Sequence, residues 1–483
     1  MLAKKIAVNT IISALARAVG ILLALATIAI ITRHLTRNEW GEYSIMLTFG
    51  GIFAVIADLG LYQLMVREIS RPQADELKIA SNIFTIRLLS GLFIFALAPL
   101  ISLFFPYSEQ AKLGILVGMA GFWLLSGGQV LIGLFQKYLQ MIKVATAELF
   151  GRLVQLGLVW WLVLSGAGFL PLVAALSLGG LANFLLIFWW ARHYCRLRLA
   201  FDRAYWWNVL QQGYPLAVAS ILTMIYFSSD SLFLSILKPA ADVGIYRLPY
   251  KILESLIFFP AMFVGLVMPL LSRFAQTDRE KFKNIFQRAS DVLIVFAIPL
   301  VAGTLVLSPA IINLLGGGKY NESTAIFNIL IVAVGMIFLG TLFSYVLIAL
   351  EKQKSLLWIS GVAAIFNIAA NLIFIPRYSY YAAAAITVLT EALVVILMAL
   401  VLYWFFRWLP SFKIFLKSLL AAAGMMAALW LLPGWNLALS LVVAAIVYFG
   451  LLYLLRGFSR ADIVNLIGGQ EGENMPGSEN SAV

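Results

Sequence analysis

The 483-residue sequence is 63% hydrophobic and only 12% charged. Because soluble domains carry about 25% charged residues, this composition excludes a water-soluble fold and indicates a polytopic membrane protein. The net charge of +12 does not indicate nucleic-acid binding, since the basic residues are spread over short loops rather than gathered in one patch.

The predicted elements are membrane-spanning helices of about 20 residues each, because open strands would leave backbone groups unpaired in hydrocarbon. The first apolar run contains Arg17 and is too long for the hydrophobic region of a signal peptide, so we expect an uncleaved first span. In chain order we predict about fourteen spans, at residues 6–32, 41–65, 79–105, 112–136, 146–166, 168–191, 213–237, 244–271, 290–315, 324–350, 356–375, 382–406, 414–432 and 437–456.

A basic connector at residues 192–214 divides the first twelve spans into two sets of six. Short similarities about 200 residues apart indicate that six spans were duplicated: EWGEYS (39–44) resembles DVGIYR (242–247), and PYSEQAKLGIL (106–116) resembles KYNESTAIFNIL (319–330). We therefore predict five units: an N-terminal six-helix bundle (1–195), a cytoplasmic amphipathic linker (196–212), a C-terminal six-helix bundle (213–406), two additional spans (407–456) and a disordered cytoplasmic tail (457–483).

The loop charges predict the orientation of the chain. If the N-terminus is cytoplasmic, the inner loops hold most of the 34 Lys and Arg residues. By the positive-inside rule, both termini are then expected to face the cytoplasm.

Charges that remain inside the predicted spans are the candidate functional groups, since a charge in hydrocarbon costs several kcal/mol. Arg17 lies about 16 Å into the first span, near the midplane, and Arg247, Lys251 and Glu254 share one helix face at i, i+4 and i+7 spacing. Arginine donates bidentate hydrogen bonds to phosphate groups. We therefore predict that an anionic substrate is bound by Arg17, Arg87, Arg247 and Lys251.

Acidic residues inside the spans are candidates for coupling or gating: Asp58, Asp230, Glu254 and Glu391. A carboxylate that alternates between an arginine and a proton can couple transport to an ion gradient. The alternative is a fixed salt bridge that only neutralises an arginine. For Asp58 the expected partner is Arg17 or Arg87.

At the outer ends of the spans, the expected partner of Asp230 is Arg247 or Lys251. Arg152, which begins a span near the inner surface, is expected to extend its charge to that surface and to be structural.

Catalysis is not expected from this chain. The single cysteine, Cys195, excludes an intrachain disulfide and a cysteine-built metal site, and the two histidines, His34 and His193, lie far apart beside basic loops. The connectors are about 20 residues at most, too short for a catalytic domain, and P-loop and nucleophile motifs are absent from the sequence. We therefore predict neither an enzyme nor a cofactor.

Several motifs in chain order resemble the polysaccharide-biosynthesis flippases of the multidrug/oligosaccharidyl-lipid/polysaccharide (MOP) exporter superfamily. The opening resembles that family in LTRNEWGEYSIM and ADLGLYQLMVREISR, the seventh and eighth spans in QQGYPLAVASILTMIYFSSDSLFLSIL and DVGIYRLPYKILESL, and the junction before the twelfth span in NLIFIPRYSYYAAAAITVLTE. The chain departs from the family's glycine pair at this junction, where it has Ser379 and Ala382.

This resemblance implies two six-helix bundles around a central cavity that opens to one side at a time. It implies a transporter that flips an undecaprenyl-pyrophosphate-linked oligosaccharide from the inner to the outer leaflet of the bacterial cytoplasmic membrane. Membrane lipids, a polysaccharide polymerase and a chain-length regulator are the partners that it suggests, and the last two spans are expected to flank a groove for the lipid tail.

Three alternatives stay open. An ion-coupled drug or cation antiporter of the same superfamily would favour an acidic cavity and twelve spans. A membrane-embedded glycan polymerase or ligase would need a large outer loop with catalytic residues. A scaffold that transports nothing would not need buried arginines.

Overall fold

The computed structural model describes residues 2–431 and 436–457, so nearly all of the predicted tail lies outside the described residues. Over these residues the chain forms α-helices and one short 3-10 helix, with no strand among them. Among the described residues, twelve helical segments are long and apolar enough to cross a membrane. The prediction of an all-α polytopic membrane protein is therefore confirmed.

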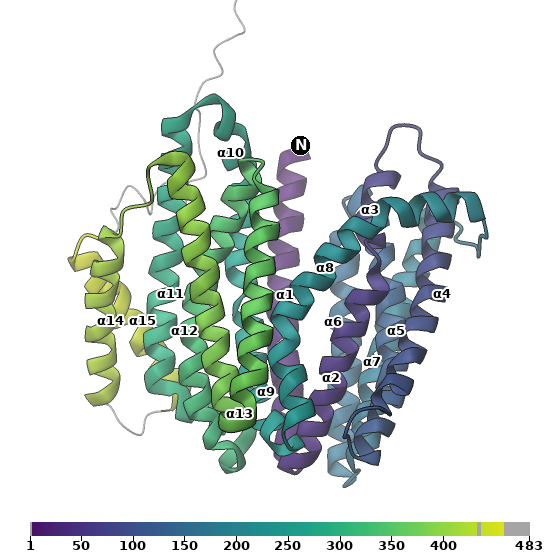
Figure 1. Cartoon of the computed structure of the whole chain (residues 1–483), viewed down its shortest axis with the longest axis horizontal. Coiled ribbons are helices and arrows are strands. Elements are labelled where there is room, and N and C mark those ends of the chain that lie inside the picture. The colour runs from purple at the N-terminus through teal and green to yellow at the C-terminus, as the bar shows by residue number, and fades with distance from the viewer. Residues whose placement is uncertain (1, 432–435, 458–483) are drawn as a thin grey trace, which may run out of the picture.

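The first seven helices form the N-terminal half (Figure 1). In this half α5 packs against α2, α3, α4 and α7, while α6 packs against α1 and α7. The predicted second span is divided, because Leu59 and Gly60 adopt left-handed conformations between α2 and α3. The bounds are Leu2–His34 (α1), Arg37–Asp58 (α2), Leu61–Ile69 (α3), Glu76–Ser102 (α4), Glu109–Lys137 (α5), Met141–Leu164 (α6) and Phe169–Tyr194 (α7).

The remaining helices follow the predicted order of the later spans. The predicted eighth span consists of α9 and α10, which meet at Ile257. The predicted eleventh and twelfth spans form α13, which is kinked at Ser379, where φ is 48°. The bounds are Arg203–Leu237 (α8), Ala240–Leu256 (α9), Phe258–Thr277 (α10), Arg279–Gly316 (α11), Gly317–Tyr320 (η1), Glu322–Ala349 (α12), Gln353–Phe406 (α13), Lys413–Leu431 (α14) and Leu437–Leu454 (α15).

We call α9–α13 the C-terminal half, and α8 connects it to the N-terminal half as one continuous helix (Figure 1). Val209, near the start of α8, belongs to a buried apolar cluster of the N-terminal half, together with Leu64 and Leu134. The later turns of α8 pack against α13. The helix thus runs without a break through the predicted boundary between residues 212 and 213.

The first part of the predicted linker is an extended segment that lies on α4. Its backbone N–H groups at Arg198, Ala200 and Asp202 donate hydrogen bonds to Ser81, Thr85 and Asn82 of α4, at 3.0 to 3.2 Å. Asp202 caps α8, and the backbone N–H of Tyr205 and the ammonium of Lys78 hold the pKa of its carboxyl below the usual range. The linker is thereby fixed to the N-terminal half.

The two halves meet most tightly where α2 begins beside α9; we call this region, from Thr32 to Gly41 with Ala240 to Gly244, the converging end (Figure 1). A Cβ atom on Gly41 would lie 1.7 Å from the carbonyl oxygen of Ala240, so only glycine allows this approach. Trp40 Nε1 donates to the carbonyl of Gly244 at 3.1 Å, and Arg37 forms a 3.0 Å ion pair with Glu322 of α12. At the opposite end, where α3 and α10 lie, the halves diverge.

The last two helices pack against each other and against α11, on the side of the C-terminal half that is remote from α4 (Figure 1). Tyr448 of α15 donates a 2.9 Å hydrogen bond to the carbonyl of Val295 in α11. α14 and α15 are therefore an addition to one edge of the molecule.

Candidate functional site

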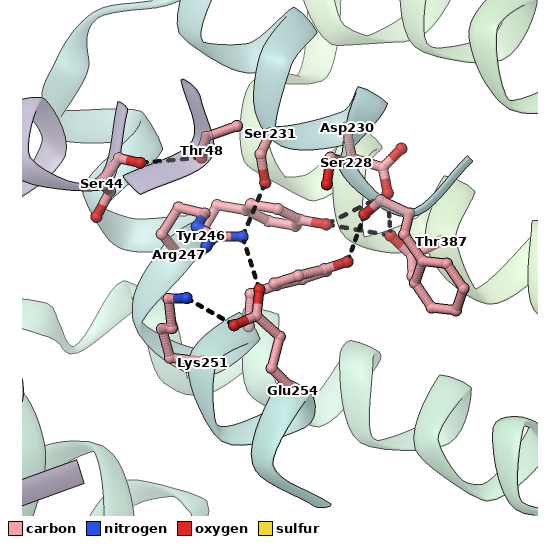
Figure 2. A network of polar contacts seen from close by, with 12 residues as sticks. Ser44, Thr48, Ser228, Asp230, Ser231, Tyr246, Arg247, Lys251, Glu254 and Thr387 are labelled. Atoms are coloured by element: carbon pink, nitrogen blue, oxygen red, sulfur yellow. Dashed lines mark hydrogen bonds and ion pairs between the residues drawn. The ribbon is translucent and has the colours of Figure 1, made fainter. Parts of the chain in front are cut away.

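The helix α9 presents three charged side chains on one face, which we call the α9 cluster: Arg247, Lys251 and Glu254. Glu254 Oε1 lies 3.3 Å from Arg247 Nη1, and Glu254 Oε2 accepts a 2.6 Å hydrogen bond from Lys251 Nζ (Figure 2). Arg247 also donates to the hydroxyl of Ser231 on α8 at 3.3 Å. Two cations thus share one carboxylate, so the cluster has an excess positive charge.

The α9 cluster lies deep in the protein and still has accessible surface. Glu254 is about 21 Å from the start of α9 at 1.5 Å per residue, well inside a hydrocarbon core of about 30 Å. Its side chain is 38% exposed, whereas that of Arg247 is 5% exposed. Arg247 Nε is buried without a hydrogen-bond partner among the described residues. Because buried donors are normally paired, Arg247 retains the capacity to bind a further acceptor.

Arg17 lies next to this region. Its guanidinium carbon is 4.8 Å from the centroid of the Phe258 ring, and Phe258 begins α10 four residues after Glu254. The Arg17 side chain is exposed, and it forms no ion pair with any residue that the structure describes. A third cation is therefore available beside the α9 cluster.

Arg152 of α6 also approaches the α9 cluster, which the sequence did not indicate. It forms a 2.8 Å ion pair with Glu148 and lies against α1, where a Cβ atom on Gly20 would be 3.3 Å from its Nε. The Arg152 guanidinium lies near enough to Lys251 for the two positive charges to repel each other. The small Gly20, opposite an arginine, is the signal that could have revealed this helix contact.

Arg87 lies apart from the other predicted substrate-binding residues. It is buried inside the N-terminal half, where its Nη1 is 3.2 Å from Asp58 Oδ1 and its Nε donates to the carbonyl of Ser126 at 3.1 Å. The Arg87 side chain is 0% exposed. Asp58 therefore pairs with Arg87 rather than with Arg17, and this pair is separate from the α9 cluster.

Asp230 is also separate from the α9 cluster, contrary to the expectation that it pairs with Arg247 or Lys251. Its carboxylate accepts hydrogen bonds from Thr387 Oγ1 at 2.6 Å and from Tyr246 at 3.4 Å (Figure 2). It also accepts a 2.6 Å hydrogen bond from Asn371 Nδ2. These donors are neutral side chains of α9 and α13. The physical reason is the helix geometry, which turns Asp230 toward α13 and leaves Glu254 as the acid nearest the cations.

A cavity of about 10 Å³ adjoins Asp230 and is also lined by Glu391, Asn367 and Thr387. Glu391 is buried at 6% exposure. The side-chain oxygen of Asn371 is buried with no partner among the described residues. This polar centre, two carboxylates with amide and hydroxyl oxygens, has room for about one water-sized particle.

Two family models match the chain. Residues 6–275 match the model described as polysaccharide biosynthesis protein, and residues 215–373 match the model described as MatE. The chain belongs to the polysaccharide biosynthesis protein family. No curated protein sequence matches the chain significantly.

Solved structures share its fold. The lipid II flippase MurJ in an inward closed conformation aligns with a TM-score of 0.77 and 15% identity, over 94% of this chain and 100% of that chain. An inward-facing multidrug resistance MATE family transporter of the MOP superfamily aligns with a TM-score of 0.64 and 14% identity, over 82% and 97%. A MOP superfamily transporter from Pyrococcus furiosus, described by the reverse polarity of its binding pocket, aligns with a TM-score of 0.58 and 14% identity, over 83% of this chain and 94% of that chain. The chain therefore shares the fold of these transporters.

Proposed function

We propose that the protein flips an oligosaccharide linked to undecaprenyl pyrophosphate from the inner to the outer leaflet of the bacterial cytoplasmic membrane. The observation that supports this substrate is the α9 cluster, in which Arg247 and Lys251 share Glu254; Arg17 lies against Phe258 at the start of α10, and Arg152 of α6 pairs with Glu148. Two carboxylates, Glu148 and Glu254, balance these cations only in part. An excess of positive charge at mid-depth suits a pyrophosphate, and the arginine fork matches its oxygens.

Alternating access would move this substrate. The loop charges support an orientation with the converging end on the outer side and both termini in the cytoplasm. The tight contact of Gly41 with Ala240 would then close the outer side, and the two halves diverge toward the inner side (Figure 1). In the transport cycle the bundles 1–195 and 213–406 would rock about the α9 cluster, with the partly exposed Glu254 as the gating residue.

We assign coupling to Asp230 and Glu391. Their cavity of about 10 Å³ accommodates a proton carrier or a small monovalent cation, and the unpaired oxygen of Asn371 would accept a hydrogen bond or coordinate the ion. Because α8, α9 and α13 all contribute to this centre, a change of its charge would alter the packing of the C-terminal half.

Arg247→Ala tests the substrate assignment. In proteoliposomes, flipping of an undecaprenyl-pyrophosphate-linked oligosaccharide, measured by lectin accessibility, should fall at least about tenfold, because charge-assisted hydrogen bonds contribute about 1.5–3 kcal/mol each. Arg377→Ala is the control, since Arg377 is an exposed arginine of α13 outside the cluster. Normal flipping by Arg247→Ala and by Arg17→Ala, with both proteins folded, would contradict the proposal.

A drug or cation antiporter is the second candidate, because residues 215–373 match the MatE model. The positive excess around Arg247 opposes a cationic substrate. Uptake of an organic cation that depends on a proton or sodium gradient, together with no flipping of the glycolipid, would favour this candidate instead.

A further inference from the structure

An apolar pocket of about 190 Å³ lies between the two halves, separate from the α9 cluster. Its walls come from three helices: Ile52, Val55 and Ile56 of α2, Ile221, Met224 and Leu232 with their neighbours on α8, and Ile368 of α13. The pocket is somewhat larger than an apolar protein cavity of about 150 Å³ that binds benzene. At the same cavity volume per carbon atom as for benzene, it accommodates about eight carbon atoms, between one and two isoprene units.

The pocket offers a ligand hydrocarbon contacts and almost no polar ones. The two hydroxyl groups in its wall are already engaged: Ser229 donates to the side-chain oxygen of Asn367, and Ser228 donates to the sulfur of Met224 at 3.5 Å. At membrane depth, the ligand chemistry that this surface fits is an aliphatic chain.

The pocket adjoins the α9 cluster along the seam between α2 and α8. Ser231, which accepts the hydrogen bond from Arg247, directly precedes the lining residue Leu232 in α8. On α2, Thr48 lies in the polar region beside Arg247, and the lining residue Ile52 follows one turn later (Figure 2). The residues between α2 and α8 are therefore polar beside the buried guanidinium of Arg247 and apolar where they line the pocket.

We propose that this pocket holds the first isoprene units of the carrier lipid while its pyrophosphate is bound by the α9 cluster. The inference rests on the proposed function and adds a site for the proximal tail, distinct from the contact expected of α14 and α15. Because Ile52 belongs to the N-terminal half and Ile368 to the C-terminal half, the tail would contact both halves at once.

Depth favours this occupant over an acyl chain of an ordinary phospholipid. Ile52 lies about 22 Å and Glu254 about 21 Å from the starts of their helices at 1.5 Å per residue, and both helices start at the converging end. A lipid whose pyrophosphate is bound at this depth must place its first tail carbons there as well. A phospholipid keeps its headgroup at the membrane interface, so only the end of its acyl chain could reach the pocket.

Binding of soluble prenyl diphosphates tests the proposal. We compare methyl diphosphate, which has the headgroup alone, with geranyl diphosphate, which adds two isoprene units, on full-length protein in phosphatidylcholine nanodiscs, subtracting binding to empty nanodiscs. Wild-type protein should bind geranyl diphosphate at least about tenfold more tightly, because each buried methylene adds about 0.8 kcal/mol.

Ile368→Trp fills the pocket and should abolish this tail-dependent gain without changing the affinity for methyl diphosphate. Ile365→Trp is the matched control, because Ile365 lies one turn away on α13 and is 72% exposed. Ile52→Phe, which fills the pocket from the opposite wall, serves if Ile368→Trp does not fold.

The two ligands separate the inference from the function on which it rests. A wild-type protein that binds both ligands equally, or a folded pocket-filling variant that keeps the gain, would overturn the tail site alone. Binding of methyl diphosphate that is unaffected by Arg247→Ala would instead contradict the pyrophosphate assignment. A gain that is lost equally in Ile365→Trp would show that the pocket is not its source and would also overturn the tail site.

Discussion

Two arginine–carboxylate groups in this protein differ in what surrounds them. Arg87 pairs with Asp58 inside the N-terminal half, its side chain 0% exposed. Arg247 shares Glu254 with Lys251 between the halves, and Glu254 is 38% exposed. The first pair is balanced in charge and enclosed, although Arg87 Nη1 and Nη2 are buried without a hydrogen-bond partner among the described residues, whereas the second group has excess positive charge and accessible surface. From this difference we expect an intramembrane arginine to bind a ligand only where unbalanced charge and accessible surface remain beside it.

The largest effect is expected from breaking the closed pair. Arg87→Ala leaves Asp58 without its cation, and removing one partner of a buried pair costs about 3–5 kcal/mol. Because the Asp58 side chain is 20% exposed, water screens its unpaired charge, and the expected loss of folding free energy is about 3 kcal/mol. Thermal unfolding in detergent should show this loss as a lower melting temperature.

The double variant Arg87→Leu/Asp58→Leu should recover part of that stability, because it removes both charges together. If Arg87→Ala were fully stable but unable to bind methyl diphosphate, the distinction between the two groups would be wrong.

The next effect concerns the contact between the two halves at the converging end. Gly41→Ala places a methyl group against the Ala240 carbonyl and should push the two halves apart there. Spin labels at Glu109 and Arg377, in a Cys195→Ser background, should report a wider distance distribution. Gly157→Ala is the control, since nothing lies within 4 Å of the added atom, and an unchanged distribution in Gly41→Ala would contradict the expectation.

A smaller effect is expected when the shared acid is removed. Glu254→Gln frees two cations from one carboxylate, so the affinity for methyl diphosphate should rise by about tenfold, which corresponds to about 1.4 kcal/mol. Asp58→Asn, the equivalent change in the closed pair, should leave this affinity unchanged. The affinities are measured by isothermal titration calorimetry. If Glu254→Gln and Asp58→Asn raised the affinity for methyl diphosphate equally, the removed carboxylate would act only through the net charge of the protein and not through its place in the α9 cluster.

The smallest effect is expected at the Arg37–Glu322 pair, whose side chains are 39% and 40% exposed. Exposed pairs contribute at most about 1 kcal/mol, so Glu322→Gln should widen the converging end only slightly. The same spin-label distances, measured at low and at high salt, should differ less between salts in the variant, because salt screens the pair in the wild-type protein. A salt response equal to that of the wild type would show that the pair does not hold the halves together.

By itself the sequence determined the helical membrane architecture, the order of the spans and the common face of Arg247, Lys251 and Glu254. These properties follow from apolar runs and from helical periodicity, which are local along the chain. The tertiary structure alone decided that Arg87 is enclosed, that Arg152 reaches the α9 cluster and that α8 belongs to both halves. Such outcomes depend on how helices rotate and pack against partners far away in sequence, as in the hydrogen bond from Thr32 to the Leu315 carbonyl across 283 residues, and hydrophobicity does not encode those rotations.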